Sequence, residues 1–217
     1  MLGYVRNYNF FVLLIGLLLF LVLTPIVQSS AAGSIRLFIL WALCLTLFVQ
    51  VWSMIDDARL FKLGMSLTIL SFLLTTINQL FHMDLLKLIS LAIFMIFFGL
   101  ATLIAAREVF SKNIITFNTF AGSFCLYLLL GMIWSIAYMI IYQLQPMSFR
   151  GLDRVIGSGE LEFIYFSYVT LTSLGYGDIV AFTPIARALA YLEVLVGQFY
   201  MAILVGTLVG KYITNRE

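Results

Sequence analysis

The chain has 217 residues, of which 63% are hydrophobic and only 10% are charged, and its mean hydropathy is +1.10. Soluble domains carry about a quarter charged residues, so this composition excludes a sizeable soluble domain and indicates an all-α membrane protein. The formal net charge of +2 is too small to indicate a nucleic-acid partner.

Six apolar segments are long enough to cross a bilayer as helices. We expect these spans at residues 9–27, 34–55, 63–81, 85–106, 117–142 and 183–209. The first closes near Pro25, and its only basic flanking residue is Arg6, which favours a retained anchor over a cleaved signal peptide.

The fourth expected span has an apolar middle. Residues 88–106 contain no charged residue, and Lys87 and Arg107 stand at the two ends. A charge that crosses the membrane field contributes about 2.3 kcal/mol per 100 mV, and steep gating needs several such charges. The sequence therefore disfavours a conventional voltage sensor and favours a lipid-facing scaffold for the first four spans.

A polar loop, residues 143–158, precedes a short helix expected at residues 161–172. Ser158 is a candidate N-cap, and Glu160 and Glu162 suit the first turn of that helix. Twelve residues are too few to span a bilayer, so we expect a re-entrant helix, buried in protein or lining a water-filled path.

The short helix leads into Ser173-Leu174-Gly175-Tyr176-Gly177, which we term the Gly-Tyr-Gly loop. Stacked rings of backbone carbonyls can replace the water shell of a cation, and Gly175 and Gly177 can adopt the positive φ that aims them at one axis. We expect the Ser173 hydroxyl to add the innermost ring, and Leu174 and Tyr176 to point away from the axis. One copy cannot close a ring, so four chains around a fourfold axis are implied.

The sixth span carries further candidates. Gln198, Met201, Val205 and Val209 recur at three- or four-residue spacing and are expected to line a cavity and inner gate, although interhelical packing is the alternative. Glu193 is the acidic residue of this span. It is either a functional group or a structural one that bonds the back of the short helix.

The Gly-Tyr-Gly loop closely resembles the TVGYG selectivity filter of tetrameric potassium channels, and the whole chain resembles their six-span class. The aromatic pair Tyr165-Phe166, Thr170, Thr172 and the sequence through Asp178 carry the resemblance. It implies a four-span domain at 1–112, a pore domain at 113–217, and K⁺ bound at Ser173, Leu174, Gly175 and Tyr176. Thr172 and Asp178 would flank the filter.

The resemblance also places Gly197 at the spacing of an inner-helix hinge, with close helix packing as the alternative. Three positions depart from the family pattern. Ser173 lacks the methyl of the usual threonine, Leu174 replaces Val or Ile, and Val169 stands where some relatives place a carboxyl that bonds the aspartate after the filter. We therefore expect a looser innermost site and, for Asp178, either another partner or water.

These features predict a homotetrameric potassium channel of the plasma membrane that is not conventionally voltage-gated. Both termini would be cytoplasmic. This topology puts seven basic residues on the inner side of the membrane and five on the outer side, which is a weak bias toward the inside. The alternatives are a weakly selective cation channel and a non-conducting scaffold or transporter. Cys44, Cys125 and His82 form no ligand cluster, so we expect no enzyme activity and no cofactor beyond the permeant K⁺, with lipid and monovalent cations as partners.

Overall fold

The computed structural model describes residues 10–30, 83–111, 116–152 and 162–214, together with scattered positions between 62 and 81. The second expected span, at 34–55, and the candidate N-cap Ser158 lie outside the described residues. The third expected span is described only at isolated positions.

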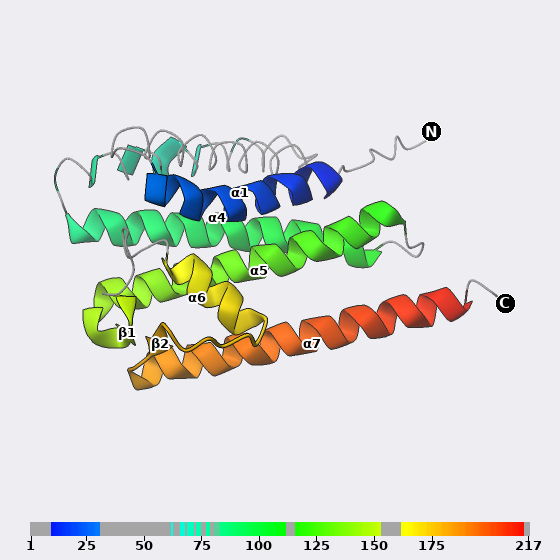
Figure 1. Ribbon diagram of the computed structural model, residues 1–217. Coiled ribbons are helices and arrows are strands. Elements are labelled where there is room, and N and C mark those ends of the chain that lie inside the picture. Colours follow the sequence, from blue (N-terminus) through cyan, green and yellow to red (C-terminus); the bar gives the residue numbers. More distant parts are fainter. Residues whose placement is uncertain are drawn as a thin grey trace.

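Four long helices lie side by side (Figure 1): α1 (Phe10–Ser30), α4 (Asp84–Ser111), α5 (Phe117–Leu144) and α7 (Pro184–Thr214). Among the described residues, three helical segments are long and apolar enough to cross a membrane, namely Asp84–Phe110, Phe117–Leu144 and Pro184–Leu204. Phe10–Ile26 is a shorter apolar helix. The chain is therefore a helical membrane protein.

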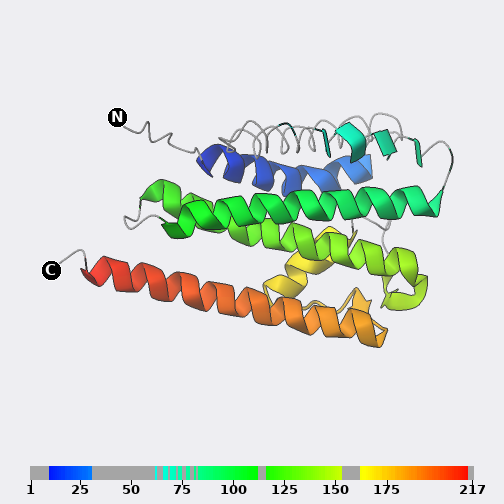
Figure 2. The ribbon, with the colours of Figure 1, turned by 180° about the vertical axis from the view of Figure 1, so that it is seen from behind.

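A short helix, α6 (Glu162–Leu171), lies between α5 and α7 in one half of the bundle (Figures 1 and 2). The chain enters α6 from the end that carries η1 (Pro146–Ser148), and after the Gly-Tyr-Gly loop it returns alongside α7 to that same end. There β1 (Phe149–Arg150) pairs with β2 (Val180–Ala181) in an antiparallel ladder. The short helix and the returning chain thus have the shape expected of a re-entrant segment, and their place in a membrane stays a prediction.

The Phe10 end of α1 and the Thr214 end of α7 lie together at the opposite end of the bundle (Figures 1 and 2). The start of α1 is fixed to the start of α5, because the backbone N–H of Phe10 donates to Oδ1 of Asn118 at 3.0 Å. Thr116 caps α5 in a capping box with Thr119.

The larger core joins α1, α4 and α5 of the same chain. Gly122 of α5 permits this close packing, since a Cβ there would meet Val109 at 2.7 Å and the Phe10 ring at 3.1 Å. The buried residues of this core include Phe10, Leu13, Leu17, Phe97, Phe98, Ala101, Ala105, Leu126 and Leu129. The expected domain boundary between residues 112 and 113 stays a prediction.

A second, aromatic core lies behind the Gly-Tyr-Gly loop. Tyr138 packs edge-on against Phe166 at 5.0 Å between ring centroids, and Phe149 packs against Phe163 at 4.9 Å. Ile179 and Ala186 complete this cluster from the segments that follow the loop. Edge-to-face rings favour defined geometry, so this core sets the position of α6 against α5.

Helix α1 continues to Ser30, past the expected end near Pro25. A proline removes one backbone donor from a helix without always ending it. The hydroxyl of Thr24 bonds the Phe20 carbonyl oxygen at 2.5 Å, which adds a side-chain bond in the turn before Pro25.

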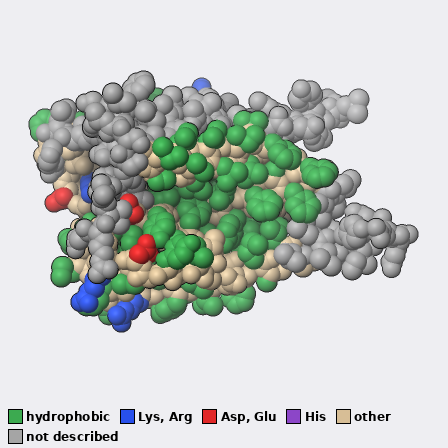
Figure 3. Space-filling view, viewed as in Figure 1, with side chains coloured by type: hydrophobic (Ala, Val, Ile, Leu, Met, Phe, Trp, Pro, Cys, Tyr) green, Lys and Arg blue, Asp and Glu red, His purple; other side chains and the backbone are tan. Residues whose placement is uncertain are grey.

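Hydrophobic side chains cover much of the bundle surface in Figure 3, and charged side chains gather toward the end that carries β1 and β2. Phe11, Leu19, Phe110 and Phe117 are among the exposed large hydrophobic residues. Such a surface fits contact with lipid or with other apolar helices.

Candidate functional site: a re-entrant helix and the Gly-Tyr-Gly loop

Helix α6 has ten residues and is therefore about 15 Å long, about half the thickness of a bilayer core. It has one acidic residue in its first turn, Glu162. Burial, followed by the charge of Asp178, raises the pKa of Glu162. The C-terminal end of α6 lies inside the bundle, where its dipole favours a cation.

The backbone of the Gly-Tyr-Gly loop alternates in handedness. Ser173, Gly175 and Gly177 have φ of 59°, 58° and 77°, whereas Leu174 and Tyr176 have negative φ. Glycine adopts positive φ at little cost, but at Ser173 this conformation is strained. Alternating handedness turns successive carbonyls toward one side, as a carbonyl-lined ion path requires.

The backbone N–H groups of residues 173–175 point back to α6. Ser173 donates to the Thr170 carbonyl at 2.9 Å, and Leu174 and Gly175 donate to the Val169 carbonyl at 2.9 and 3.2 Å. Among the described residues, the carbonyl oxygens of residues 173–177 accept no hydrogen bond. The N–H groups of residues 173–175 are thus bonded to the helix, while the carbonyl oxygens remain available for a cation.

Asp178 ends the loop and is held from two sides. The Tyr165 hydroxyl donates to Oδ2 at 2.5 Å, and the Ile179 N–H donates to Oδ1 at 3.0 Å. The bond from Tyr165 holds the pKa of Asp178 below its ordinary value. Tyr165 is therefore the other partner that the valine at position 169 led us to expect.

Gly151 supports the same end of the loop. Its φ is +95°, and a Cβ at this position would overlap the carbonyl oxygen of Asp178. Next to it, the Arg150 guanidinium lies 3.4 Å from the centroid of the Phe182 ring. The β1–β2 ladder thus forms a close backing for the outer end of the loop.

At the inner end, Gln198 of α7 reaches the loop. Its Nε2 donates to the Ser173 hydroxyl at 2.8 Å. The neighbouring Thr172 hydroxyl instead donates to the Tyr168 carbonyl of α6 at 2.6 Å. Gln198 and Met201 are both exposed within the single chain, whereas the side chains of Val205 and Val209 lie outside the described part. The cavity and gate assignments stay predictions.

A buried carboxyl group joins α7 to the back of α6. Oε1 of Glu193 accepts from the Ser167 hydroxyl and Oε2 from the Tyr138 hydroxyl of α5, both at 2.5 Å. Glu193, Ser167 and Tyr138 are completely buried. This arrangement confirms the structural alternative for Glu193.

Two further tyrosines fix α6 against α5. Tyr127 donates to the Leu171 carbonyl at 3.1 Å, and Tyr168 donates to the Leu128 carbonyl at 2.6 Å. Tyr168 fits because Gly131 has no side chain: a Cβ there would lie 2.6 Å from the ring. The sequence analysis did not identify these contacts, because the partners are about 40 residues apart and share no motif.

Gly197 of α7 packs directly against the end of α6. A Cβ at this position would overlap the carbonyl oxygen of Leu171. Helix α7 continues through Gly197 from Pro184 to Thr214. Close packing is thus an observed role of Gly197, and its role as a hinge stays a prediction.

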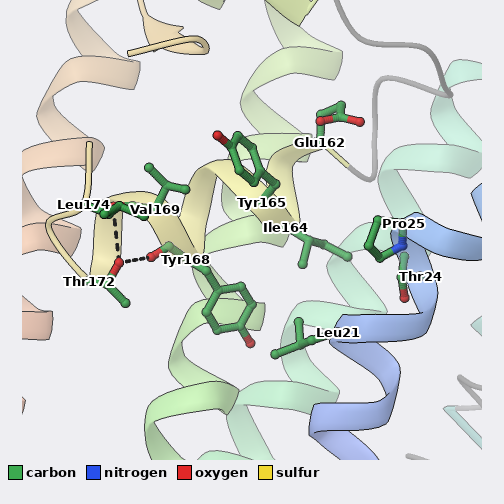
Figure 4. A pocket seen from close by; sticks show the side chains of 10 residues that line it. All are labelled: Leu21, Thr24, Pro25, Glu162, Ile164, Tyr165, Tyr168, Val169, Thr172 and Leu174. Atoms are coloured by element: carbon green, nitrogen blue, oxygen red, sulfur yellow. Dashed lines mark hydrogen bonds between the residues drawn. The ribbon is translucent and has the colours of Figure 1, made fainter. Parts of the chain in front are cut away.

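A groove of about 620 Å³ lies between α1 and α6 (Figure 4). Leu21, Thr24 and Pro25 of α1 face Ile164, Tyr168 and Val169 of α6, and Leu174 of the loop lies at one edge. The lining is mostly apolar. The described residues contain no cluster of His, Cys, Asp or Glu that could hold a metal ion.

Comparison with known families matches residues 124–214 to the family described as Ion channel. The matched stretch contains most of α5, all of α6 and the Gly-Tyr-Gly loop, and α7. The match indicates an ion channel. No curated protein and no solved structure matches the chain.

Proposed function

We propose that the chain is the subunit of a homotetrameric channel that passes K⁺ passively through the Gly-Tyr-Gly loop. The observation that carries this proposal is the alternating backbone of residues 173–177, whose carbonyl oxygens accept no hydrogen bond from the part of the chain that the structure describes. In the proposed filter, Ser173, Leu174, Gly175 and Tyr176 supply the K⁺ ligands, and Thr172 and Asp178 flank them. No covalent chemistry is involved, so the protein is not an enzyme.

Exposure of large side chains near the loop supports assembly from four copies. Tyr176 is 68% exposed and Leu174 is 55% exposed, although both belong to the loop that must be held most firmly. On α7, Phe199 is 63% exposed. In a fourfold ring these side chains would meet neighbouring subunits, which would supply the supporting wall that one chain lacks.

The proposed location is the plasma membrane, with both termini in the cytoplasm. The Phe10 end of α1 and the Thr214 end of α7 lie opposite the end that carries β1 and β2 (Figure 1). With the proposed filter near the outer face of the membrane, both helix ends would be inside. Six spans, an even number, would also put both termini on the same side of the membrane.

Helix α4 supports a channel without a conventional voltage sensor. Its charged residues, Asp84, Lys87, Arg107 and Glu108, lie near its two ends. Between them the helix packs apolar side chains against α1 and α5. Movement of this helix would carry little charge through the membrane field, so we assign the first four spans a scaffold role.

The reversal potential of the purified protein in planar bilayers, under opposed K⁺ and Na⁺ gradients, tests this function. We compare wild type with Gly175→Ala, which forces a side chain into a backbone with φ of +58°. Gly99→Ala is the matched control, because nothing lies within 4 Å of the added Cβ in α4.

Reversal near the K⁺ equilibrium potential, with current lost only in Gly175→Ala, would support the proposal. Reversal near zero with the same mutant sensitivity would instead identify a weakly selective cation channel. Absence of current from a correctly assembled wild-type protein, across voltages and pH values, would favour a scaffold or transporter.

A further inference from the structure

We propose that Gln198 positions the Ser173 hydroxyl as a ligand of the innermost cation site and thereby restores the restraint that serine lacks. This inference rests on the proposed function, since it assigns a role within the same ion path. Its basis is the 2.8 Å bond from Gln198 Nε2 to Ser173 Oγ, which joins α7 to the first residue of the Gly-Tyr-Gly loop.

Serine at this position has a conformational problem. A threonine side chain is stiff at χ1 because two heavy atoms branch from its Cβ, whereas serine has one and rotates more freely. An oxygen that binds an ion well must be preorganised toward it. Without a second contact, the Ser173 hydroxyl would spend part of its time in rotamers that face away from the ion path.

The bond from Gln198 orients the Ser173 hydroxyl and leaves its oxygen able to bind a cation. A hydroxyl oxygen has two acceptor lone pairs and one donor hydrogen. The amide of Gln198 occupies one lone pair, so the hydroxyl hydrogen cannot point toward Gln198 Nε2. The second lone pair remains for a cation.

The backbone of α7 at Gln198 is itself held in place. The preceding residue, Gly197, packs against the carbonyl of Leu171, two positions before Ser173. The Cα of Gln198 is therefore held at a set height relative to the end of α6. The backbone of Ser173 is anchored separately, by its N–H bond to Thr170.

The oxygen of the Gln198 amide adds to the site. Because Nε2 is directed at Ser173, Oε1 is the other branch of the same planar group and is free to accept from water. Gln198 is exposed within the chain. Four copies would place four such acceptor oxygens at the inner end of the filter, on the path of a hydrated cation that enters it.

The potassium-to-sodium permeability ratio tests this role in four full-length proteins: wild type, Gln198→Leu, Ser173→Thr, and the double variant. Threonine is the usual residue at this position in the resembled family, and its methyl supplies the restraint without an amide. Gln143→Leu is the matched control. It also removes a glutamine side-chain bond, to Asp84 at 2.7 Å, but at the far end of α5.

We expect Gln198→Leu to lower the permeability ratio roughly three- to tenfold, the effect of losing one ordinary hydrogen bond. The double variant should return close to the wild-type ratio, and Gln143→Leu should keep it. A purely structural role for Gln198 would not predict rescue by a methyl group on Ser173.

Three results would overturn the inference. These are a Gln198→Leu channel that keeps the wild-type ratio, a double variant as unselective as Gln198→Leu, and an equal loss in Gln143→Leu. Should Gln198→Leu fail to assemble, Gln198→Asn keeps an amide that is one methylene too short, and it should lower the ratio too. A wild-type protein without cation current would refute the proposed function itself, a result distinct from all of these.

Discussion

The hydroxyl of Tyr165, in the first half of α6, donates a 2.5 Å hydrogen bond to the carboxylate of Asp178 at the outer end of the Gly-Tyr-Gly loop. The bond joins two residues that are thirteen positions apart, and the whole loop lies between them. It is charge-assisted, a class that is stronger than neutral hydrogen bonds. The loop is thereby tied to its own helix at the outer end, while Gln198 holds the inner end from α7.

Replacement of Tyr165 with phenylalanine should release the outer end of the loop. We expect the conducting state to lose current roughly fivefold faster during sustained recording, as about 1 kcal/mol of hydrogen bonding is removed. Single-channel recording measures this lifetime. Tyr142→Phe is the control, because its ring packs on Phe163 and its hydroxyl makes no hydrogen bond to the described residues. Unchanged lifetimes in Tyr165→Phe would show that the tether has no role in conduction.

The same pair predicts a response to acid on the outer side. The bond from Tyr165 lowers the folded-state pKa of Asp178 below its ordinary value of 3.8. A carboxyl with a depressed pKa stabilises the fold above its ordinary pKa, and this stabilisation is lost as pH falls through the depressed value. Current should therefore hold from pH 7 to about 5 and decline below about 4.

In Tyr165→Phe the acid decline should begin at higher pH, because the ordinary pKa of the carboxyl returns. Titration of the outer solution alone, with single-channel recording, measures both curves. Coincident curves for the two proteins would contradict the assignment of Tyr165 as the group that shifts Asp178.

Sequence reasoning located the re-entrant helix and the loop because both are local features. A short helix between a polar stretch and a Gly-Tyr-Gly run is visible within about 20 residues of sequence, and α6 ends at Leu171, one residue from the expected end. The handedness at Gly175 and Gly177 follows from glycine itself. The unusual φ of Ser173 could not be predicted, since it depends on contacts made by the folded chain.

The contacts that hold the loop escaped prediction for a related reason. Gln198 and Ser173 are 25 residues apart, and Tyr138 and Glu193 are 55 apart. No periodic pattern links such partners. Of these residues, Glu193 could be singled out from the sequence, because a carboxyl group in an apolar helix needs polar partners. The sequence did not indicate which residues would bond to it.

The carboxyl group of Glu193 should contribute strongly to the stability of the bundle. Glu193→Leu would leave the buried Tyr138 hydroxyl without its acceptor, whereas the Ser167 hydroxyl keeps the Gly131 carbonyl oxygen at 2.8 Å. We expect a loss of about 2 kcal/mol in unfolding free energy. Glu193→Gln keeps one acceptor oxygen and should lose about half as much. Denaturant unfolding in detergent, followed by tyrosine and tryptophan fluorescence, measures both.

Ser167→Ala and Tyr138→Phe each remove one of the two donors and provide the comparison for Glu193. If each costs as much as Glu193→Leu, the three residues act as one unit. If Glu193→Leu is no less stable than wild type, the carboxyl group serves another purpose than joining α5, α6 and α7.

Gly197→Ala should separate a packing role from a hinge role. If close packing against Leu171 is what matters, the added Cβ forces α7 away from α6, and stability should fall by roughly 1–3 kcal/mol. If Gly197 serves only as a hinge, alanine should instead raise helix stability by up to about 1 kcal/mol while it lowers the open probability.

Gly206→Ala is the matched control on the same helix, because nothing lies within 4 Å of its added Cβ. The overlap with the Leu171 carbonyl leads us to expect the first result, with thermal stability lowered in Gly197→Ala and retained or raised in Gly206→Ala. Equal or higher stability in Gly197→Ala would contradict the packing role.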